Sequence, residues 1–224
     1  MKLYGVIASP YVTRVLLFAH LKGIELPIEG VPGGTTRGPE YLKLNPIGKM
    51  PALEVNGQII PESEIICDYL EDAFPTKSGL GADPLQRARS RLIARIVDLY
   101  LSASTGAFFR QLNPANRDQA ALDASAAELK KAFGYIEHYM GPGPFAIGTE
   151  PTLGDCALYP YTILIKKVVF ANFPGTTDPT LGDGRLAKWW NATNANSAFN
   201  AIGGEYGAAV DGFLKAMASR GRPA

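Results

Sequence analysis

The first 75 residues combine short apolar runs with two patterns of helical spacing. The apolar runs at residues 2–7 and 24–29 predict strands. Between them, apolar residues recur at helical spacing over residues 11–22 and stop at Gly23, a residue that often ends helices. Further along, the pattern predicts a short helix at 39–44, strands at 52–55 and 58–60, and a helix at 63–74. The predicted order is therefore β-α-β-α-β-β-α.

The predicted hairpin has two unusual local features. Its turn is Asn56-Gly57, a pair that tolerates the positive φ angles of two-residue hairpins. Its first strand is preceded by Met50-Pro51, and proline has no N–H to donate to a strand ladder. We therefore expect Met50-Pro51 at a sheet edge or a special site.

The helix after the hairpin opens with Glu62-Ser63. Backbone N–H groups point outward at a helix start, and the helix dipole is positive there. This segment therefore predicts a helix start that favours an anion, beside an exposed backbone edge.

The rest of the chain has a different character. Residues 75–84 are mostly turn-forming and predict a linker. Every later pattern is helical, with helices predicted at 85–112, 117–140, from Thr152 onward, 184–196 and 206–219, and a Gly/Pro/Thr-rich loop at 171–184. We expect an α/β domain at residues 1–77, followed by an all-helical domain at 84–224.

Composition narrows the possible functions. The 224 residues are 46% hydrophobic and carry a net charge of +1, which favours neither nucleic acid nor an anionic membrane as a partner. The N-terminus has no signal-peptide layout, and no apolar run has transmembrane length. The two cysteines, Cys67 and Cys156, lie on apolar helical stretches and favour buried thiols in a reducing compartment. His20 and His138 lack metal-ligand spacing, so no metal site is expected, and we predict a cytoplasmic protein.

Four local patterns occur in a specific order. They are Ser9-Pro10-Tyr11-Val12-Thr13-Arg14-Val15, then Lys49-Met50-Pro51-Ala52-Leu53, then Glu62-Ser63 before an apolar pair, and finally Thr152-x-x-Asp155. Together with the element order, they resemble the cytosolic glutathione transferase family, and the first pattern is most like its serine-type, tau-like branch. The resemblance covers nearly the whole chain. It implies a thioredoxin-like N-terminal domain, an all-helical C-terminal domain, glutathione as co-substrate and a homodimer.

The resemblance assigns glutathione contacts to the hairpin region. It implies a cis peptide before Pro51 and pairing of the Met50 backbone with the cysteinyl part of glutathione. It also implies that Glu62 meets the ammonium group and that Ser63 holds the γ-glutamyl carboxylate. Lys49 is a candidate for the glycyl carboxylate, although a solvated loop charge is an equal alternative.

Ser9 is the candidate catalytic residue. A thiolate is the reactive form of a thiol, and a serine hydroxyl at a helix start favours the anion. The alternative is that Ser9 only caps its helix. Tyr11 is either a wall of the site or a packing residue, and Arg14 is expected to be a structural charge.

The resemblance also places a hydrophobic electrophile between the domains, against the long helix at 85–112. Tyr100, Phe108 and Phe109 are the aromatic residues expected to line it, with helix packing or dimer contact as the alternative for each. Asp98 is a candidate to reach glutathione in a partner subunit.

Three functions remain open on sequence alone. The first is a glutathione transferase that conjugates the thiol to hydrophobic electrophiles. The second is a glutathione-dependent lyase, isomerase or peroxidase using the same site. The third is a non-catalytic binding protein of the same fold.

Overall fold

The computed structural model describes residues 1–220, which form two compact units. The first unit contains residues 1–79 and 201–220, and the second contains residues 80–200. The predicted domains, residues 1–77 and 84–224, are each one continuous segment of the chain. That division remains a prediction.

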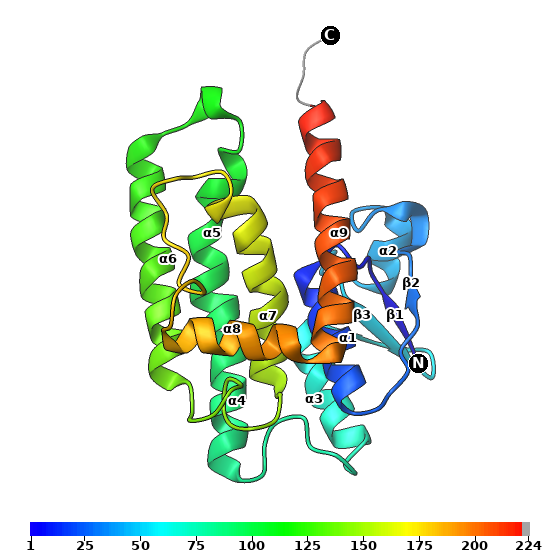
Figure 1. Ribbon diagram of the computed structural model, residues 1–224. Coiled ribbons are helices and arrows are strands. Elements are labelled where there is room, and N and C mark those ends of the chain that lie inside the picture. Colours follow the sequence, from blue (N-terminus) through cyan, green and yellow to red (C-terminus); the bar gives the residue numbers. More distant parts are fainter. Residues whose placement is uncertain (221–224) are drawn as a thin grey trace. The chain divides into compact units, whose positions relative to one another are not determined.

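The first unit is a four-stranded sheet with helices (Figure 1). Its strands lie in the order β2-β1-β3-β4, with β1 and β2 parallel and the other two pairs antiparallel. Its elements are β1 (Lys2–Tyr4), α1 (Pro10–Leu21), β2 (Ile28–Glu29), the 3-10 turn η1 (Pro32–Gly34), α2 (Pro39–Leu44), β3 (Ala52–Val55), β4 (Gln58–Pro61), α3 (Ser63–Ala73) and, from residue 201 onward, α9 (Ser197–Arg220). The thioredoxin-like β-α-β-α-β-β-α prediction is confirmed.

The first two strands are shorter than predicted. β1 ends at Tyr4, and a Cβ added to the next residue, Gly5, would lie 2.5 Å from a methyl group of Val12. β2 keeps only its last two residues, because the Ile24 amide bonds back to Ala19 at the end of α1. Contacts with α1 therefore leave both strands shorter than the apolar runs predict.

The hairpin forms where the sequence predicts it. Asn56 and Gly57 have φ angles of 49° and 79°, as the turn prediction requires. Ala52 pairs with Pro61 across the hairpin and with Tyr4 on the other side. This register fixes which strand ends lie next to each other.

A buried ion pair joins α1 and α3 at the far end of the unit. Lys22 Nζ lies 2.6 Å from a Glu71 carboxylate oxygen and donates to the Lys77 carbonyl. Glu71 also accepts from Ser78 and from the Gly79 amide. The start of the predicted linker is therefore held against the first unit.

All secondary-structure elements of the second unit are helical. Its elements are α4 (Pro84–Ile96), the π-helical turn η2 (Val97–Leu101), α5 (Ser102–Arg110), the 3-10 turn η3 (Pro114–Asn116), α6 (Gln119–Tyr139), α7 (Leu153–Ile165), the π-helical turn η4 (Lys166–Phe170), α8 (Arg185–Ala195) and the first turn of α9 (Ser197–Arg220). The helix predicted at 85–112 thus contains a π-turn. The last helix begins at Ser197 rather than near 206, because the Asn196 side chain accepts from the Ala198 and Phe199 amides.

Asp155 organises the start of α7. Its carboxylate accepts from the Thr152 amide and hydroxyl, from the Ala146 amide and from the Trp189 indole. Burial raises the pKa of this fully buried carboxyl group, against the effect of these hydrogen bonds. The capping pair predicted from Thr152-x-x-Asp155 is therefore also a tertiary anchor.

One continuous helix, Pro84–Arg110, has the length and apolar composition to cross a membrane. About 44% of its apolar window is buried inside the fold, and α4 packs against α7. The core helix of a helical unit has the same length and composition. This finding differs from the sequence-based expectation, and the absence of a membrane partner remains a prediction.

Candidate active site

The sheet register brings three chain segments to one edge. Tyr4 at the end of β1 pairs with Ala52 at the start of β3, and Ala52 pairs with Pro61 at the end of β4. The segment after β1, the segment before β3 and the segment after β4 therefore begin at the same sheet edge. Those segments carry Ser9, Met50-Pro51 and Glu62-Ser63.

Ser9 is the N-cap residue of α1 and is half-buried. Its Oγ accepts from the Val12 amide at 3.5 Å, a distance at the outer limit for a hydrogen bond. Accepting uses a lone pair and leaves the hydroxyl proton for another acceptor. Thr13 fixes the preceding turn by donating to the carbonyls of Ile7 and Ser9.

The peptide between Met50 and Pro51 is cis, as the family resemblance implied. The strand ladder begins at Ala52, so the Met50 amide and carbonyl lie outside the sheet pairing. The Lys49 carbonyl just before them accepts from Tyr41 Oη at 2.7 Å and from Asn45 Nδ2 at 2.8 Å.

Tyr41 is fully buried, and this burial raises the pKa of its phenol group, which keeps the hydroxyl protonated as a donor. The Lys49 side chain is exposed. Tyr41 and Asn45 therefore hold the backbone of this segment and leave the lysine side chain in solvent.

Glu62 and Ser63 have contrasting environments at the start of α3. Glu62 is exposed and has a φ of 68°, a left-handed conformation that non-glycine residues rarely adopt. Ser63 is only 6% exposed, and its Oγ accepts from Arg14 Nη1 at 3.1 Å. Left-handed backbone conformations like that of Glu62 often occur at ligand-binding positions, where the surrounding structure enforces them.

Arg14 is 1% exposed, and its guanidinium also lies over the Tyr11 ring, 5.4 Å from the centroid. It connects the start of α1 with the start of α3. The sequence predicted a structural charge at Arg14, but no local pattern indicates its contact with Ser63. Likewise, no local pattern indicates that the Tyr41 hydroxyl reaches Lys49.

The aromatic residues expected at the electrophile site have different surroundings. Tyr100, in the π-turn η2, is 51% exposed and meets Tyr135 edge-on at 5.6 Å between ring centroids. Phe108 is buried and meets Phe173 edge-on at 5.0 Å. For both residues, contact with the electrophile remains a prediction.

Comparison with known proteins identifies the family. Residues 3–78 match the model for the glutathione S-transferase N-terminal domain, and residues 119–192 match the model for its C-terminal domain. Maleylacetoacetate isomerase of Pseudomonas aeruginosa is 32% identical over 169 residues, which cover 71% of this chain and 79% of that protein. The chain belongs to the glutathione S-transferase family.

Other relatives agree with this assignment. Glutathione S-transferase 1 of Dianthus caryophyllus is 31% identical over 168 residues, covering 73% of this chain and 76% of that protein. The holo structure of a bacterial maleyl pyruvate isomerase, a glutathione S-transferase of the zeta class, superposes with a TM-score of 0.72 at 25% identity, covering 90% of this chain and 96% of that one. This transferase is therefore an enzyme with glutathione as co-substrate, as predicted. The serine-type, tau-like detail remains a prediction.

Proposed function

We propose that Ser9 activates the glutathione thiol and that the resulting thiolate attacks hydrophobic electrophiles. The supporting observation is the position of the Ser9 hydroxyl at the start of α1, on the sheet edge shared with Met50 and Glu62. A free thiol has a pKa of about 8.5, so it is mostly protonated near neutral pH. Donation of the hydroxyl proton to sulfur and the positive end of α1 both favour the thiolate.

The remaining glutathione contacts follow from the same edge. The Met50 backbone pairs with the cysteinyl residue like one rung of a sheet, beside Pro51. Glu62 binds the ammonium group. Ser63, supported by Arg14, binds the γ-glutamyl carboxylate at the start of α3, where backbone N–H groups favour an anion. Lys49 is proposed for the glycyl carboxylate because its side chain is exposed.

The test separates anion stabilisation from helix capping at Ser9. Ser9→Ala removes both roles, whereas Ser9→Asp retains a good cap but places a negative charge beside the sulfur. With 1-chloro-2,4-dinitrobenzene, a carbon–sulfur bond forms, the carbon–chlorine bond breaks and chloride leaves. We expect both variants to lose about 10²-fold or more in kcat, as is usual when one key anion donor is removed.

Ser9→Thr keeps a hydroxyl and serves as the conservative control, with activity within about tenfold of the parent. Thermal unfolding should show Ser9→Asp close to the parent, because aspartate caps as well as serine. A loss smaller than about threefold in Ser9→Ala, or normal activity in Ser9→Asp, would contradict the proposal.

A second reaction is favoured by the isomerase relatives. Addition of a thiolate to a cis carbon–carbon double bond gives a freely rotating single bond, and expulsion of the thiolate then yields the trans isomer. The names of two relatives, maleylacetoacetate isomerase and maleyl pyruvate isomerase, fit this chemistry. Ser9-dependent conversion of maleylpyruvate, with no net consumption of glutathione, would assign isomerase activity. No turnover of maleylpyruvate would leave conjugation as the function.

We further propose that Tyr11, Tyr100 and Phe108 contact the electrophile. Aromatic side chains supply large apolar contact areas and accept many shapes, which suits a broad set of hydrophobic substrates. Tyr11→Ala and Tyr100→Ala should raise the KM for the electrophile and leave the KM for glutathione unchanged. An effect on glutathione alone would contradict this role.

We also propose a cytoplasmic homodimer that acts in detoxification, without nucleic acid or membrane partners. Exposed apolar residues on the long helix, including Leu92 and Leu99, supply a contact surface for a second copy. Asp98, between them, is proposed to reach the glutathione of the partner subunit. Asp98→Ala should then weaken glutathione binding in the dimer.

A further inference from the structure

The segment between β1 and α1 carries Ser9 and is held mainly through its backbone. The Ser9 amide donates to the Val6 carbonyl at 3.1 Å, and the Ser9 carbonyl accepts from the Thr13 amide at 3.0 Å. By contrast, the hydrogen bond from the Val12 amide to the Ser9 hydroxyl is long, at 3.5 Å. The direction of the Ser9 hydroxyl therefore depends on how firmly its backbone is fixed.

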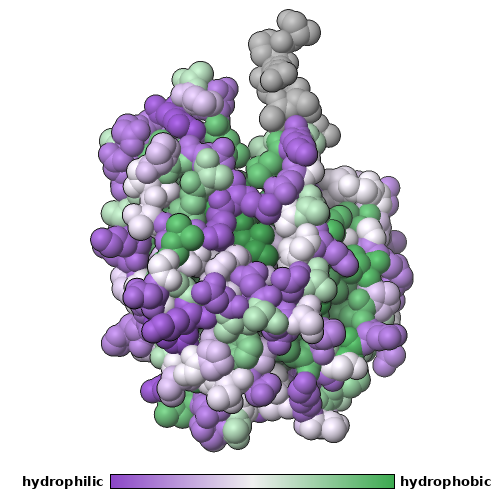
Figure 2. Space-filling view, viewed as in Figure 1, coloured by the Kyte–Doolittle hydropathy of each residue, from purple (hydrophilic) through white to green (hydrophobic). Residues whose placement is uncertain are grey.

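Thr13 on α1 is a polar residue inside the first unit. On the face shown in Figure 2, hydrophilic residues cover most of the helices, whereas Thr13 is 0% exposed. Its hydroxyl lies 3.1 Å from the Ile7 carbonyl oxygen and 3.1 Å from the Ser9 carbonyl oxygen. A hydroxyl has one proton, so the two carbonyls share one donor. Thr13 therefore connects two points of the segment that carries Ser9.

The contact with Ile7 exceeds what helix geometry provides. Threonine hydroxyls inside helices can donate to the carbonyl four residues earlier. Thr162 in α7 does so, with its hydroxyl 2.8 Å from the Leu158 carbonyl. The bond from Thr13 to Ser9 is of this kind, but the bond to Ile7 reaches six residues back, before the start of α1.

Close packing restrains the other end of the same segment. Gly5 follows β1, and a Cβ added to it would lie 2.5 Å from a methyl group of Val12, which is fully buried. The backbone at Gly5 therefore has no room to move toward α1. Both ends of residues 5–9 are restrained, one by packing and the other by Thr13.

We propose that the Thr13 hydroxyl is a positioning group for thiolate formation. By holding the Ile7 and Ser9 carbonyls, it fixes the direction in which the Ser9 hydroxyl donates to the sulfur of glutathione. Thr13 is buried and acts through Ser9, so this inference rests on the proposed role of Ser9. A donor that is already in place when the thiol binds stabilises the anion without reorganisation.

Thr13→Val tests the proposal, because valine keeps the shape of threonine and removes the hydroxyl. The pKa of the bound glutathione thiol, read from the ultraviolet absorbance of the thiolate as the pH is raised, should move toward the value of about 8.5 for a free thiol. The kcat for 1-chloro-2,4-dinitrobenzene should fall about tenfold, the size of effect expected for one hydrogen bond. The KM for glutathione should stay constant, because its other proposed contacts remain. An unchanged thiol pKa and kcat would overturn the proposal.

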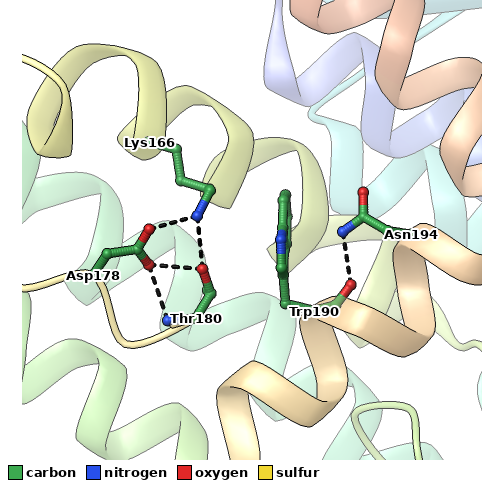
Figure 3. Close-up of polar contacts among 5 residues, drawn as sticks. All are labelled: Lys166, Asp178, Thr180, Trp190 and Asn194. Carbon is green, nitrogen blue, oxygen red and sulfur yellow. Dashed lines mark hydrogen bonds and ion pairs between the residues drawn. The ribbon is translucent and has the colours of Figure 1, made fainter. Parts of the chain in front are cut away.

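Thr13→Ser and Thr180→Val are the matched controls. Serine keeps the hydroxyl, so Thr13→Ser should have nearly the thiol pKa and kcat of the parent. Thr180 is 4% exposed, and its hydroxyl contacts Asp178 and Lys166 in the second unit (Figure 3). Thr180→Val thus also loses a buried hydroxyl, but it should react like the parent. Equal losses in Thr13→Ser and Thr13→Val, or in Thr180→Val and Thr13→Val, would overturn the proposal.

A double variant separates positioning from a general effect on the fold. If Thr13 acts only through Ser9, adding Thr13→Val to Ser9→Ala should cause no further loss in kcat. Losses that multiply would overturn the positioning role. Thermal unfolding shows whether each variant is folded, and Thr13→Ala takes the place of Thr13→Val if the valine variant does not fold.

The same titration distinguishes this inference from the role of Ser9. An unchanged thiol pKa in Ser9→Ala would overturn both. A shifted thiol pKa in Ser9→Ala, together with an unchanged one in Thr13→Val, would overturn only the role of Thr13.

Discussion

Single buried polar groups position the segments around the candidate site. Tyr41 and Asn45 hold the Lys49 carbonyl, and Arg14 holds the Ser63 hydroxyl. Buried donors and acceptors cost free energy when they lose a partner, so each of these bonds restrains its neighbour. The residues proposed to touch glutathione therefore depend on Tyr41, Asn45 and Arg14, for which no such contact is proposed.

Tyr41→Phe tests this restraint. Removing one hydroxyl leaves the Lys49 carbonyl with only Asn45 and should lower the free energy of unfolding by about 1 kcal/mol. We expect the KM for glutathione to rise severalfold while kcat stays constant, because Tyr41 acts through the backbone at Lys49. Steady-state kinetics would show this, with exposed Tyr139→Phe as the control. An unchanged KM would contradict the positioning role.

Glu71 makes stability depend on pH. Burial alone would raise the pKa of this carboxyl group, but the hydrogen bonds from Lys22, Gly79 and Ser78 and the Lys22 charge outweigh it and lower the pKa. A carboxylate with a lowered folded-state pKa stabilises the fold above its unfolded pKa, about 4.5 here. That contribution is lost as the pH falls through the folded-state pKa.

Glu71→Gln should therefore destabilise the fold by about 3 kcal/mol at pH 7, because Lys22 stays buried without its counter-charge. The difference from the parent should shrink at pH 3. Urea unfolding at both pH values measures this, and the exposed Glu128→Gln is the control. A difference that stays constant with pH would show that the Glu71 charge does not contribute.

At the scale of elements, caps decide where helices start. Asp83 caps α4 by accepting from the Leu85 and Gln86 amides in an exposed position. Asp155 caps α7 from within the core, and both of its carboxylate oxygens accept hydrogen bonds from buried groups. The same residue type therefore contributes locally in one helix and through tertiary contacts in the other.

The pair Asp155→Asn and Asp83→Asn separates these contributions. An asparagine at 155 offers N–H groups to two buried donors, and each unmatched donor costs about 1–3 kcal/mol. We expect a loss of about 3 kcal/mol or more for Asp155→Asn and almost none for Asp83→Asn, since asparagine and aspartate cap equally well. Urea unfolding would measure both, and similar losses would contradict the distinction.

At the scale of the whole molecule, the exposed apolar residues are the feature that bears on assembly. Leu92 and Leu99 lie seven residues apart, which places them on one face of the long helix, and Leu99 is 49% exposed. Tyr100, Tyr135 and Tyr139 are also exposed in the same unit. Apolar groups of this kind are typical of surfaces that bind a partner.

Leu99→Arg tests the proposed homodimer. The parent should elute at twice the chain mass in light-scattering chromatography, and Leu99→Arg should shift toward the monomer, because it places a charge in an apolar contact. Leu181→Arg, at a residue 70% exposed in a loop, should remain dimeric. A monomeric parent, or a dimeric Leu99→Arg, would contradict the proposed contact surface.

Local sequence determined the parts of this protein that depend on neighbouring residues. Asn56-Gly57 makes its turn because both positions need positive φ, and Thr152-x-x-Asp155 caps a helix because the spacing matches one turn. The order of the elements and the family followed from such patterns. Ser9, Met50, Glu62 and Ser63 also came from local patterns, although their roles in binding and catalysis remain proposals.

Tertiary structure alone decided the contacts between distant residues. No local pattern pairs Arg14 with Ser63, 49 positions away, or shows that the fold buries both. The shortened first strands and the helix start at Ser197 likewise depend on packing. Backbone preferences act over a few neighbouring residues, whereas burial and side-chain contacts are set only when the whole chain has folded.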